Sequence, residues 1–279
     1  MNILSWNIQA TKGVDGRFDV MRIAELIKAY GDLDIICLQE ISRHIPDQNN
    51  DDQLALIGGL FSNHKAVWAP GFTVLDGDQR ESQFGNVSLV KPSLLKKAQV
   101  HSLPSPVVDT LQMPRTMVEL LIESNDHRFT LFNTHLAFHS ETEIASQLRA
   151  LTSLRDERIA KSRQKTPSGL HGPYAYSAPS EEVILCGDLN VDANSELYDK
   201  EVARQGWIDC WEMQSTSANK ANGRPPTCGC FDAEQWPQGP HVRDYFLATS
   251  GIASKTKKVE VNVETDASDH QPVFIELTL

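Results

Sequence analysis

Six short stretches of the chain share one pattern, in which an apolar or strand-like segment ends in Asn, Asp, Glu or His. A single polar side chain after a strand is usually solvated, but six in one chain are hard to attribute to chance. In α/β architectures the ends of buried strands are where sites are built, because the rigid sheet positions what the loop exposes. The six stretches are Ile3–Asn7, Ile35–Glu40, Leu131–Leu136, Ile184–Asn190, Arg243–Phe246 and Ser268–Pro272.

The rest of the sequence alternates strand-like and helical patterns, which favours an α/β fold. Apolar periodicity predicts helices at about 22–27, 52–61 and 140–162. Short apolar runs predict strands at 3–6, 34–38, 65–69, 86–90, 117–122, 129–134, 183–186, 244–248, 258–263 and 273–277. Long loops are expected at 165–181 and 214–241. Because no Pro/Gly linker divides the 279 residues, we expect a single domain over residues 1–279.

The charge balance limits how the protein can bind nucleic acid. There are 26 Lys+Arg against 37 Asp+Glu, which gives a net charge of −11. Strong non-specific binding to nucleic acid depends on neutralising phosphates with Lys and Arg, so this composition speaks against it. An acidic protein can still bind a phosphate where a metal supplies the positive charge locally.

The cysteines and the lengths of the apolar segments indicate in which cellular compartment the protein is expected. The five cysteines are an odd number, and two of them, Cys37 and Cys186, lie in apolar runs, which suits reduced thiols. The first residues show no signal-peptide pattern, and no run approaches the roughly 18 apolar residues of a membrane span. We therefore expect a cytoplasmic protein without a membrane span, and nothing in the sequence indicates a protein partner.

In order and placement, the six stretches resemble the endonuclease/exonuclease/phosphatase superfamily of metal-dependent phosphoesterases. The resemblance runs from Asn7 to Pro272, and its most specific parts are Gly187-Asp188-Leu189-Asn190 and Ser268-Asp269-His270. It implies a four-layer α/β/β/α sandwich, with two packed mixed or antiparallel sheets flanked by helices and the site between the sheet edges. The superfamily includes exonuclease-III-like repair enzymes, deoxyribonucleases, sphingomyelinases, phosphatases and some non-catalytic regulators.

Hydrolysis of a phosphoester needs a Lewis acid on the phosphoryl oxygens, an activated water in line and a donor for the leaving oxygen. Glu40 is the best metal ligand, with Asn7 as its partner, and Asp269 can help from the far end of the chain. A few protein oxygens suit Mg²⁺, and Mn²⁺ should substitute. The absence of a Cys/His cluster argues against zinc.

The resemblance assigns roles to the remaining polar residues. Asp188 orients or deprotonates the attacking water, and Asn190 holds a phosphoryl oxygen. His270 stabilises the phosphorane with Asp244 as its partner, and His135 contacts the phosphate or protonates the leaving group. Which histidine is the acid, and whether Asp188 or His270 takes the proton of the water, stays open.

Further residues are candidates for substrate contacts at the edge of the site. Asn86 is either a ligand contact or a turn residue, and Arg115 either binds phosphate or caps a strand. His241 and Arg243 closely precede Asp244 and are expected at the rim. Aromatic side chains in the two long loops either stack on a base or pack within the loop; they are Tyr174, Tyr176, Phe231 and Trp236.

These loops carry few basic residues, which favours a small or single-stranded phosphoester over duplex DNA. The sequence therefore predicts a Mg²⁺-dependent phosphodiesterase or phosphatase acting on a nucleotide, a short oligonucleotide or another small phosphoester. The alternatives are an exonuclease-III-like DNA nuclease and a catalytically silent regulator of the same fold.

Overall fold

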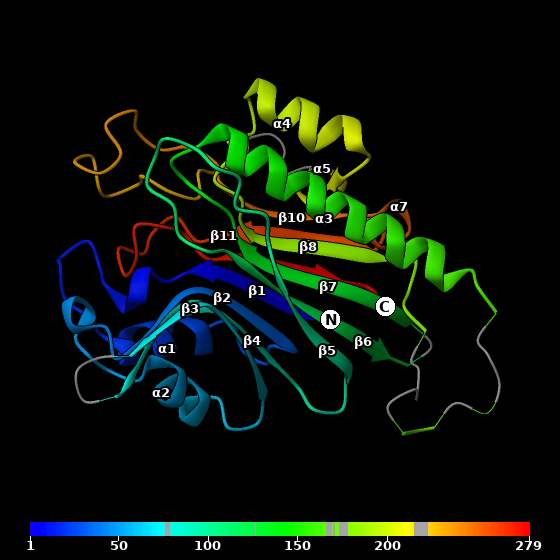
Figure 1. Ribbon diagram of the computed structural model, residues 1–279, viewed down its shortest axis with the longest axis horizontal. Coiled ribbons are helices and arrows are strands. Elements are labelled where there is room, and N and C mark those ends of the chain that lie inside the picture. The colour runs from blue at the N-terminus through cyan, green and yellow to red at the C-terminus, as the bar shows by residue number, and fades with distance from the viewer. Residues whose placement is uncertain (76–78, 126, 166–168, 170, 173–177, 215–222) are drawn as a thin grey trace.

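Two six-stranded sheets pack face to face, and helices cover both outer faces (Figure 1). The computed structural model describes residues 1–75, 79–125, 127–165, 169, 171–172, 178–214 and 223–279. Helices α1 (Val20–Lys28) and α2 (Gln53–Leu60) lie on the first sheet. Helices α3 (Glu141–Ser162) and α4 (Glu196–Glu201) lie on the second. The expected four-layer α/β/β/α sandwich is confirmed.

The first sheet has the strand order β11-β12-β1-β2-β4-β3. Strands β1 and β2 run parallel and are connected through α1, whereas the other neighbours are antiparallel. The strands are β1 (Asn2–Asn7), β2 (Ile35–Arg43), β3 (Lys65–Leu75), β4 (Glu81–Val90), β11 (Thr256–Val261) and β12 (Val273–Leu277).

The second sheet has the order β5-β6-β7-β8-β10-β9 and repeats this arrangement. Its one parallel pair, β7 and β8, is connected through α3. The strands are β5 (Leu95–Ser102), β6 (Thr116–Ser124), β7 (His127–His135), β8 (Val183–Asp188), β9 (Ile208–Asp209) and β10 (Asp244–Ala248). Short helices α5 (Cys210–Met213) and α7 (Ser250–Ala253) and 3₁₀ turns at Gln9–Thr11, Pro46–Gln48 and Ala203–Gln205 complete the fold.

Side-chain alternation along the central strands builds the layers. Ile3 and Ile184 face the core between the two sheets. Their neighbours in sequence point outward, Leu4 toward α1 and Leu185 toward α3. Strand β8 is therefore buried on both faces, which explains its continuous apolar sequence.

The structure corrects several element boundaries. Strand β5 was not predicted: it is an edge strand with mostly exposed side chains, among them Lys96 and Lys97, so its sequence lacks a buried run. Strands β3 and β4 extend beyond 65–69 and 86–90 as a long hairpin, whose outer part also has exposed residues. In the part of the chain that the structure describes, none of the helices has the length and apolarity required to cross a bilayer.

Candidate active site

The ends of the central strands bring eight of the predicted site residues together at one end of the sandwich. Neighbouring strands of each sheet end side by side, and the two sheets meet face to face, so residues far apart in sequence become neighbours. The eight are Asn7 at the end of β1, Glu40 in β2, His135 at the end of β7, Asp188 at the end of β8, Asn190 just after it, Asp244 at the start of β10, and Asp269 and His270 before β12.

A bulge in β2 directs Glu40 toward the site. The pairing of β2 with β4 shifts register between Leu38 and Ile41, and Glu40 has a φ of 59°. A β-bulge re-aims a side chain, and a non-glycine residue in the left-handed region is held there at a cost. The strained backbone thus faces the carboxylate of Glu40 toward Asn7 and His135.

Gly187 lets the two strands that carry His135 and Asp188 approach closely. Its φ is 126°, and a Cβ at this position would lie 1.9 Å from the carbonyl oxygen of Thr134. Only glycine fits this conformation and this space. The parallel register then sets His135 beside Asp188.

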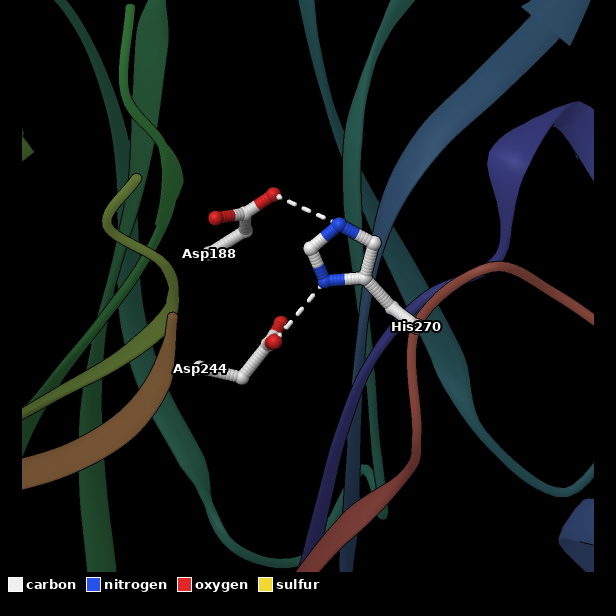
Figure 2. A group of neighbouring side chains, drawn as sticks. All are labelled: Asp188, Asp244 and His270. Carbon is white, nitrogen blue, oxygen red and sulfur yellow. Dashed lines mark hydrogen bonds and ion pairs between the residues drawn. The ribbon is translucent and has the colours of Figure 1, made fainter. Parts of the chain in front are cut away.

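His270 is held between two carboxylates from the opposite sheet (Figure 2). Its Nδ1 lies 2.8 Å from Asp244 Oδ2, and its Nε2 lies 3.5 Å from Asp188 Oδ2. Burial alone would lower the pKa of His270, but the carboxylates of Asp244, Asp188 and Asp269 raise this pKa well above its usual value. His270 is therefore charged at neutral pH.

The two carboxylates respond differently to this cation. Burial raises the pKa of Asp244 to about 6, although His270 opposes that shift. Burial would also raise the pKa of Asp188, but the charged His270 and hydrogen bonds from the Asn7 side chain and the Asn190 backbone lower it. Of these two carboxylates, Asp188 is therefore the one that ionises more readily. The ligand atoms of Asp188, Asp244 and His270 lie within 4.8 Å of one another, but both ring nitrogens of His270 already face carboxylates, so we regard the group as hydrogen-bonded rather than metal-ligating.

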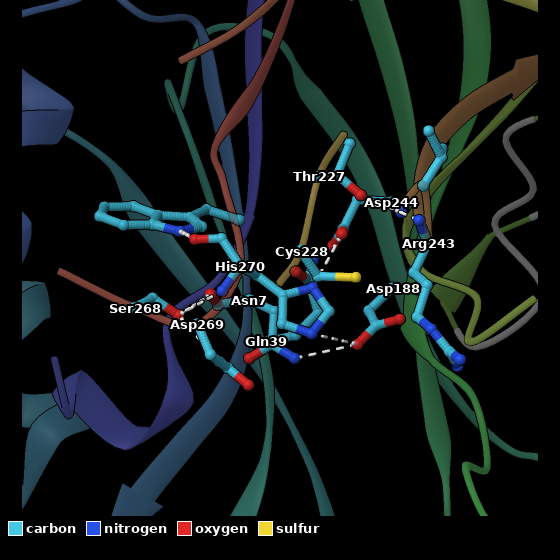
Figure 3. A network of polar contacts seen from close by, with 12 residues as sticks. Asn7, Gln39, Asp188, Thr227, Cys228, Arg243, Asp244, Ser268, Asp269 and His270 are labelled. Carbon is cyan, nitrogen blue, oxygen red and sulfur yellow. Dashed lines mark hydrogen bonds and ion pairs between the residues drawn. The ribbon is translucent and has the colours of Figure 1, made fainter. Parts of the chain in front are cut away.

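Asn7 connects the two sheets through its amide (Figure 3). Its Nδ2 donates to Glu40 Oε1 at 2.9 Å and to Asp188 Oδ2 at 3.0 Å. Its Oδ1 accepts from the backbone nitrogen of Gln9, which fixes the orientation of the amide. Gln9 thus contributes its backbone here, while its side chain contacts Gln235.

The carboxylates of Glu40, Asp188 and Asp269 form a site that suits a divalent cation. Burial raises the pKa of Glu40 to about 7, and the nearby Asp269 and Asp188 add to the shift. Like charges this close favour a cation among them. Oxygen donors without a cysteine fit Mg²⁺ or Mn²⁺. The residues present therefore fit the metal expected from the sequence.

His135 is buried beside the same carboxylates but carries no positive charge. Burial and the guanidinium of Arg115 lower the pKa of His135 to about 3. Its Nδ1 lies 3.6 Å from Glu40 Oε1, and its Nε2 contacts Asn190 Nδ2 at 3.0 Å. The site thus contains one charged and one neutral histidine.

A cavity of about 180 Å³ is lined by Glu40, His135, Asp188, Asn190, Asp269 and His270. Arg115 lies in its wall, and the buried Nε of this guanidinium has no hydrogen-bond partner in the described structure. Two aromatic side chains, Phe138 and Trp236, contact each other edge to face at 5.9 Å and line another side. The cavity combines acidic groups, one arginine and an aromatic wall.

Other candidates lie around this cavity with different partners. Asn86 lines a small adjoining hollow with Arg115 and His135, and its amide nitrogen donates to the backbone oxygen of Thr116. Phe231 is 46 % exposed, and Trp236 is packed against His270. Tyr174 and Tyr176 lie outside the described residues.

Sequence reasoning did not find Phe138 or Gln235. Gln235 Nε2 donates to Asp269 Oδ2 at 2.8 Å, from within a loop whose composition carries no positional signal. Phe138 follows His135 by three residues and is 44 % exposed. An exposed aromatic residue beside a candidate histidine was the available signal.

The chain belongs to the Endonuclease/Exonuclease/phosphatase family, whose sequence model matches residues 4–270. Members of this family are generally hydrolases that act on phosphoesters. The expected family is thus confirmed over nearly the whole sequence. No curated protein matches the sequence significantly.

Several solved structures share the fold. An endonuclease/exonuclease/phosphatase from Beutenbergia cavernae is 20 % identical with a TM-score of 0.73, covering 100 % of this chain and 71 % of that one. A mannosyl-6-phosphatase from Bacteroides thetaiotaomicron is 18 % identical, with a TM-score of 0.70 and full coverage of both chains. Truncated TDP2 from Caenorhabditis elegans is 23 % identical, with a TM-score of 0.64 and coverage of 98 % and 96 %.

Proposed function

We propose that the protein is a Mg²⁺-dependent phosphoesterase that hydrolyses a phosphodiester or phosphomonoester by in-line attack of water. The observation that carries the proposal is one cavity in which the carboxylates of Glu40, Asp188 and Asp269 meet the His270–Asp244 pair and Arg115. A binding module would not require the acidic cluster, the charged histidine and the arginine around the same space.

Asn7, Glu40 and Asp269 would hold the metal. When bound, Mg²⁺ or Mn²⁺ supplies a Lewis acid that offsets the charge on the phosphoryl oxygens. Glu40 provides the central carboxylate. Asn7 positions it through a hydrogen bond, and Gln235 positions Asp269 in the same way.

The remaining residues act on the substrate directly. Asp188 is ionised and faces the cavity, so it orients the attacking water and can take its proton. His270 is charged; its Nδ1 is bound to Asp244, whereas its Nε2 lies 3.5 Å from Asp188 Oδ2 and would donate to the phosphoryl oxygens as negative charge develops there. Arg115 adds a second positive group to the phosphate site, and His135, which lines the same cavity, would contact the phosphate or the leaving oxygen. Asn190 lines this pocket, and Asn86 lines the small hollow that adjoins it.

The cavity favours a small or single-stranded phosphoester. Its volume of about 180 Å³ holds a phosphate with a small substituent, and Arg115 is the one arginine in its described lining. The two named relatives of similar fold are a mannosyl-6-phosphatase and TDP2, so the fold alone does not select the substrate. A nucleotide, a short oligonucleotide and a sugar phosphate are the classes to test first. The five free thiols support a cytoplasmic location, because thiols stay reduced in that compartment.

The test is a panel of nucleotides, short single strands, duplex and abasic DNA, and sugar phosphates, assayed with Mg²⁺ and with Mn²⁺. We expect turnover of a small or single-stranded substrate, loss of turnover in Glu40→Gln and His270→Ala, and wild-type turnover in the control Glu25→Gln, which changes an exposed carboxylate of α1. Preference for duplex or abasic DNA would favour the nuclease alternative. If the wild type hydrolyses no substrate of the panel, or if Glu40→Gln hydrolyses every substrate that the wild type does, the proposal is wrong.

A further inference from the structure

Arg243 lies outside the cavity wall but connects to His135 through Asn190. It immediately precedes Asp244 and lies on the side of the site that also carries Asp188 (Figure 3). Nη1 contacts both the backbone oxygen and Oδ1 of Asn190, each at 3.2 Å. Because a guanidinium can only donate, the Asn190 amide must present its oxygen to Arg243.

The other side of the Asn190 amide therefore presents its nitrogen to His135. Nδ2 lies 3.0 Å from His135 Nε2 and donates to the carbonyl oxygen of Leu136 at 3.1 Å. An amide nitrogen can only donate, so His135 Nε2 accepts at this contact. Both amide hydrogens and the amide oxygen of Asn190 are thus engaged within the protein.

The second neighbour of His135 Nε2 is more distant. Asp188 Oδ2 lies 3.3 Å away, compared with 3.0 Å for Asn190 Nδ2. A hydrogen on Nε2 would point at Asp188 but would oppose the donor of Asn190 at the shorter contact. Because Nε2 accepts from Asn190, the ring carries its hydrogen on Nδ1, which faces Glu40 Oε1 at 3.6 Å.

The guanidinium of Arg243 is itself held on several sides. Its Cζ lies 5.3 Å from the ring centre of Phe138 and 5.1 Å from that of Trp236. Its Nε donates to His241 Nε2 at 2.7 Å, and His241 Nδ1 donates to the backbone oxygen of Gly239 at 2.8 Å. Stacking on aromatic faces and a planar fork of donors are properties that lysine lacks.

We propose that Arg243 is a positioning residue, which fixes the Asn190 amide and so keeps His135 in the Nδ1–H tautomer facing Glu40. In this tautomer, Nδ1 is the hydrogen-bond donor and faces the carboxylate of Glu40. Nε2 is the acceptor and faces away from Glu40. The catalytic consequence rests on the function proposed above, whereas the tautomer itself is a property of the free protein.

The test is ¹⁵N NMR of the full chain labelled with [¹⁵N]histidine, without substrate or metal. The His135 signals are assigned by their loss in His135→Gln. We expect the Nδ1–H pattern in the wild type and a shift toward Nε2–H in Arg243→Met. Methionine keeps an extended side chain against the rings of Phe138 and Trp236. Arg243→Lys, which retains charge without the fork, should shift in the same direction. Arg204→Met, at an arginine that is 74 % exposed, is the matched control and should leave the signals unchanged.

Kinetics on the substrate found by the panel supply the second readout. Arg243→Met should lower kcat about tenfold with little change in KM, as expected for loss of an outer hydrogen-bond partner. An Nε2–H tautomer in the wild type, or the same His135 pattern in the wild type and Arg243→Lys, would overturn the proposal. Because NMR reads the free protein, that result is distinguishable from a wild type that hydrolyses nothing.

Discussion

Asp188 and Asp244 face each other directly across the antiparallel pair of β8 and β10. Like charges at such a position destabilise a sheet. His270, from the other sheet, offsets both by contacting each carboxylate with one ring nitrogen. The charged histidine therefore has a structural role as well as its proposed catalytic one.

Removal of His270 should lower activity and stability together. We expect His270→Ala to reduce kcat/KM by at least about 10²-fold and to lower the free energy of unfolding by about 3 kcal/mol, because two buried carboxylates lose their cation. Urea denaturation measures the second effect. The double variant His270→Ala/Asp244→Asn should regain part of the stability without regaining activity. Equal stability of the single and double variants would show that His270 does not offset this repulsion.

Metal binding should stabilise the folded protein through Glu40. Ligand at 100 times its Kd raises the free energy of unfolding by about 2.7 kcal/mol, so Mn²⁺ or Mg²⁺ should raise the Tm of metal-free protein. Chelation should abolish hydrolysis, and added Mg²⁺ should restore it. Glu40→Gln should lose the metal-dependent rise in Tm, whereas Glu25→Gln should keep it. An unchanged rise in Glu40→Gln would place the metal elsewhere.

A buried ion pair far from the active site should make stability depend on pH. Glu119 is bound by Arg158 at 2.7 Å and by His101 at 2.6 Å. Burial alone would raise the pKa of Glu119, but His101 and Arg158 lower it to about 2. Because the folded-state pKa lies below the unfolded value, the contribution is fully present above about pH 5 and is lost as the pH falls toward 2. The loss should reach about 3 kcal/mol.

Urea denaturation at several pH values between 7 and 3 measures this effect. Glu119→Gln should be less stable at pH 7 and should lose less stability than the wild type as the pH falls. Glu25→Gln serves as the control and should follow the wild-type curve. Parallel curves for the wild type and Glu119→Gln would contradict the assignment to Glu119.

Two glycines with opposite environments should respond oppositely to alanine. At Gly187, a Cβ would strike the carbonyl oxygen of Thr134 and the φ is unfavourable, so Gly187→Ala should lower stability by about 3 kcal/mol or more. At Gly58, inside α2, a Cβ would meet open space, so Gly58→Ala should raise stability by roughly 0.5–1 kcal/mol. Thermal denaturation of both variants checks the pair. A mild effect at Gly187 would show that β7 and β8 can separate.

The family resemblance was sufficient to predict the four layers, and the apolar runs were sufficient to predict the ends of the central strands. Apolar runs such as 183–186 are buried on both faces, so their pattern does not depend on distant partners. Strand β5 escaped prediction because it is exposed at a sheet edge. That residues 1–279 form one domain stays a prediction, supported by the pairing of β1 with β12.

For the site, strand ends indicated which residues meet but not how they bond. The contact of Asn190 with His135 depends on the orientation of an amide set by Arg243 and Leu136. Gln235 reaches Asp269 from a loop without periodicity. Such contacts follow from strand register and loop path, neither of which leaves a pattern in the sequence. The roles of the individual site residues therefore stay predictions.

The distance in sequence between Asn7 and His270 has a consequence for synthesis. Asn7 lies at the end of β1, and His270 precedes β12, the strand that pairs with β1. The backbone oxygen of His270 also accepts a hydrogen bond from Trp6 at 2.9 Å. While a ribosome is still translating residues before 270, the nascent chain has the carboxylates of Glu40, Asp188 and Asp244 but lacks their cation. If the protein hydrolyses phosphoesters as proposed, this activity arises only after translation has passed β12, and incomplete chains released early would have none.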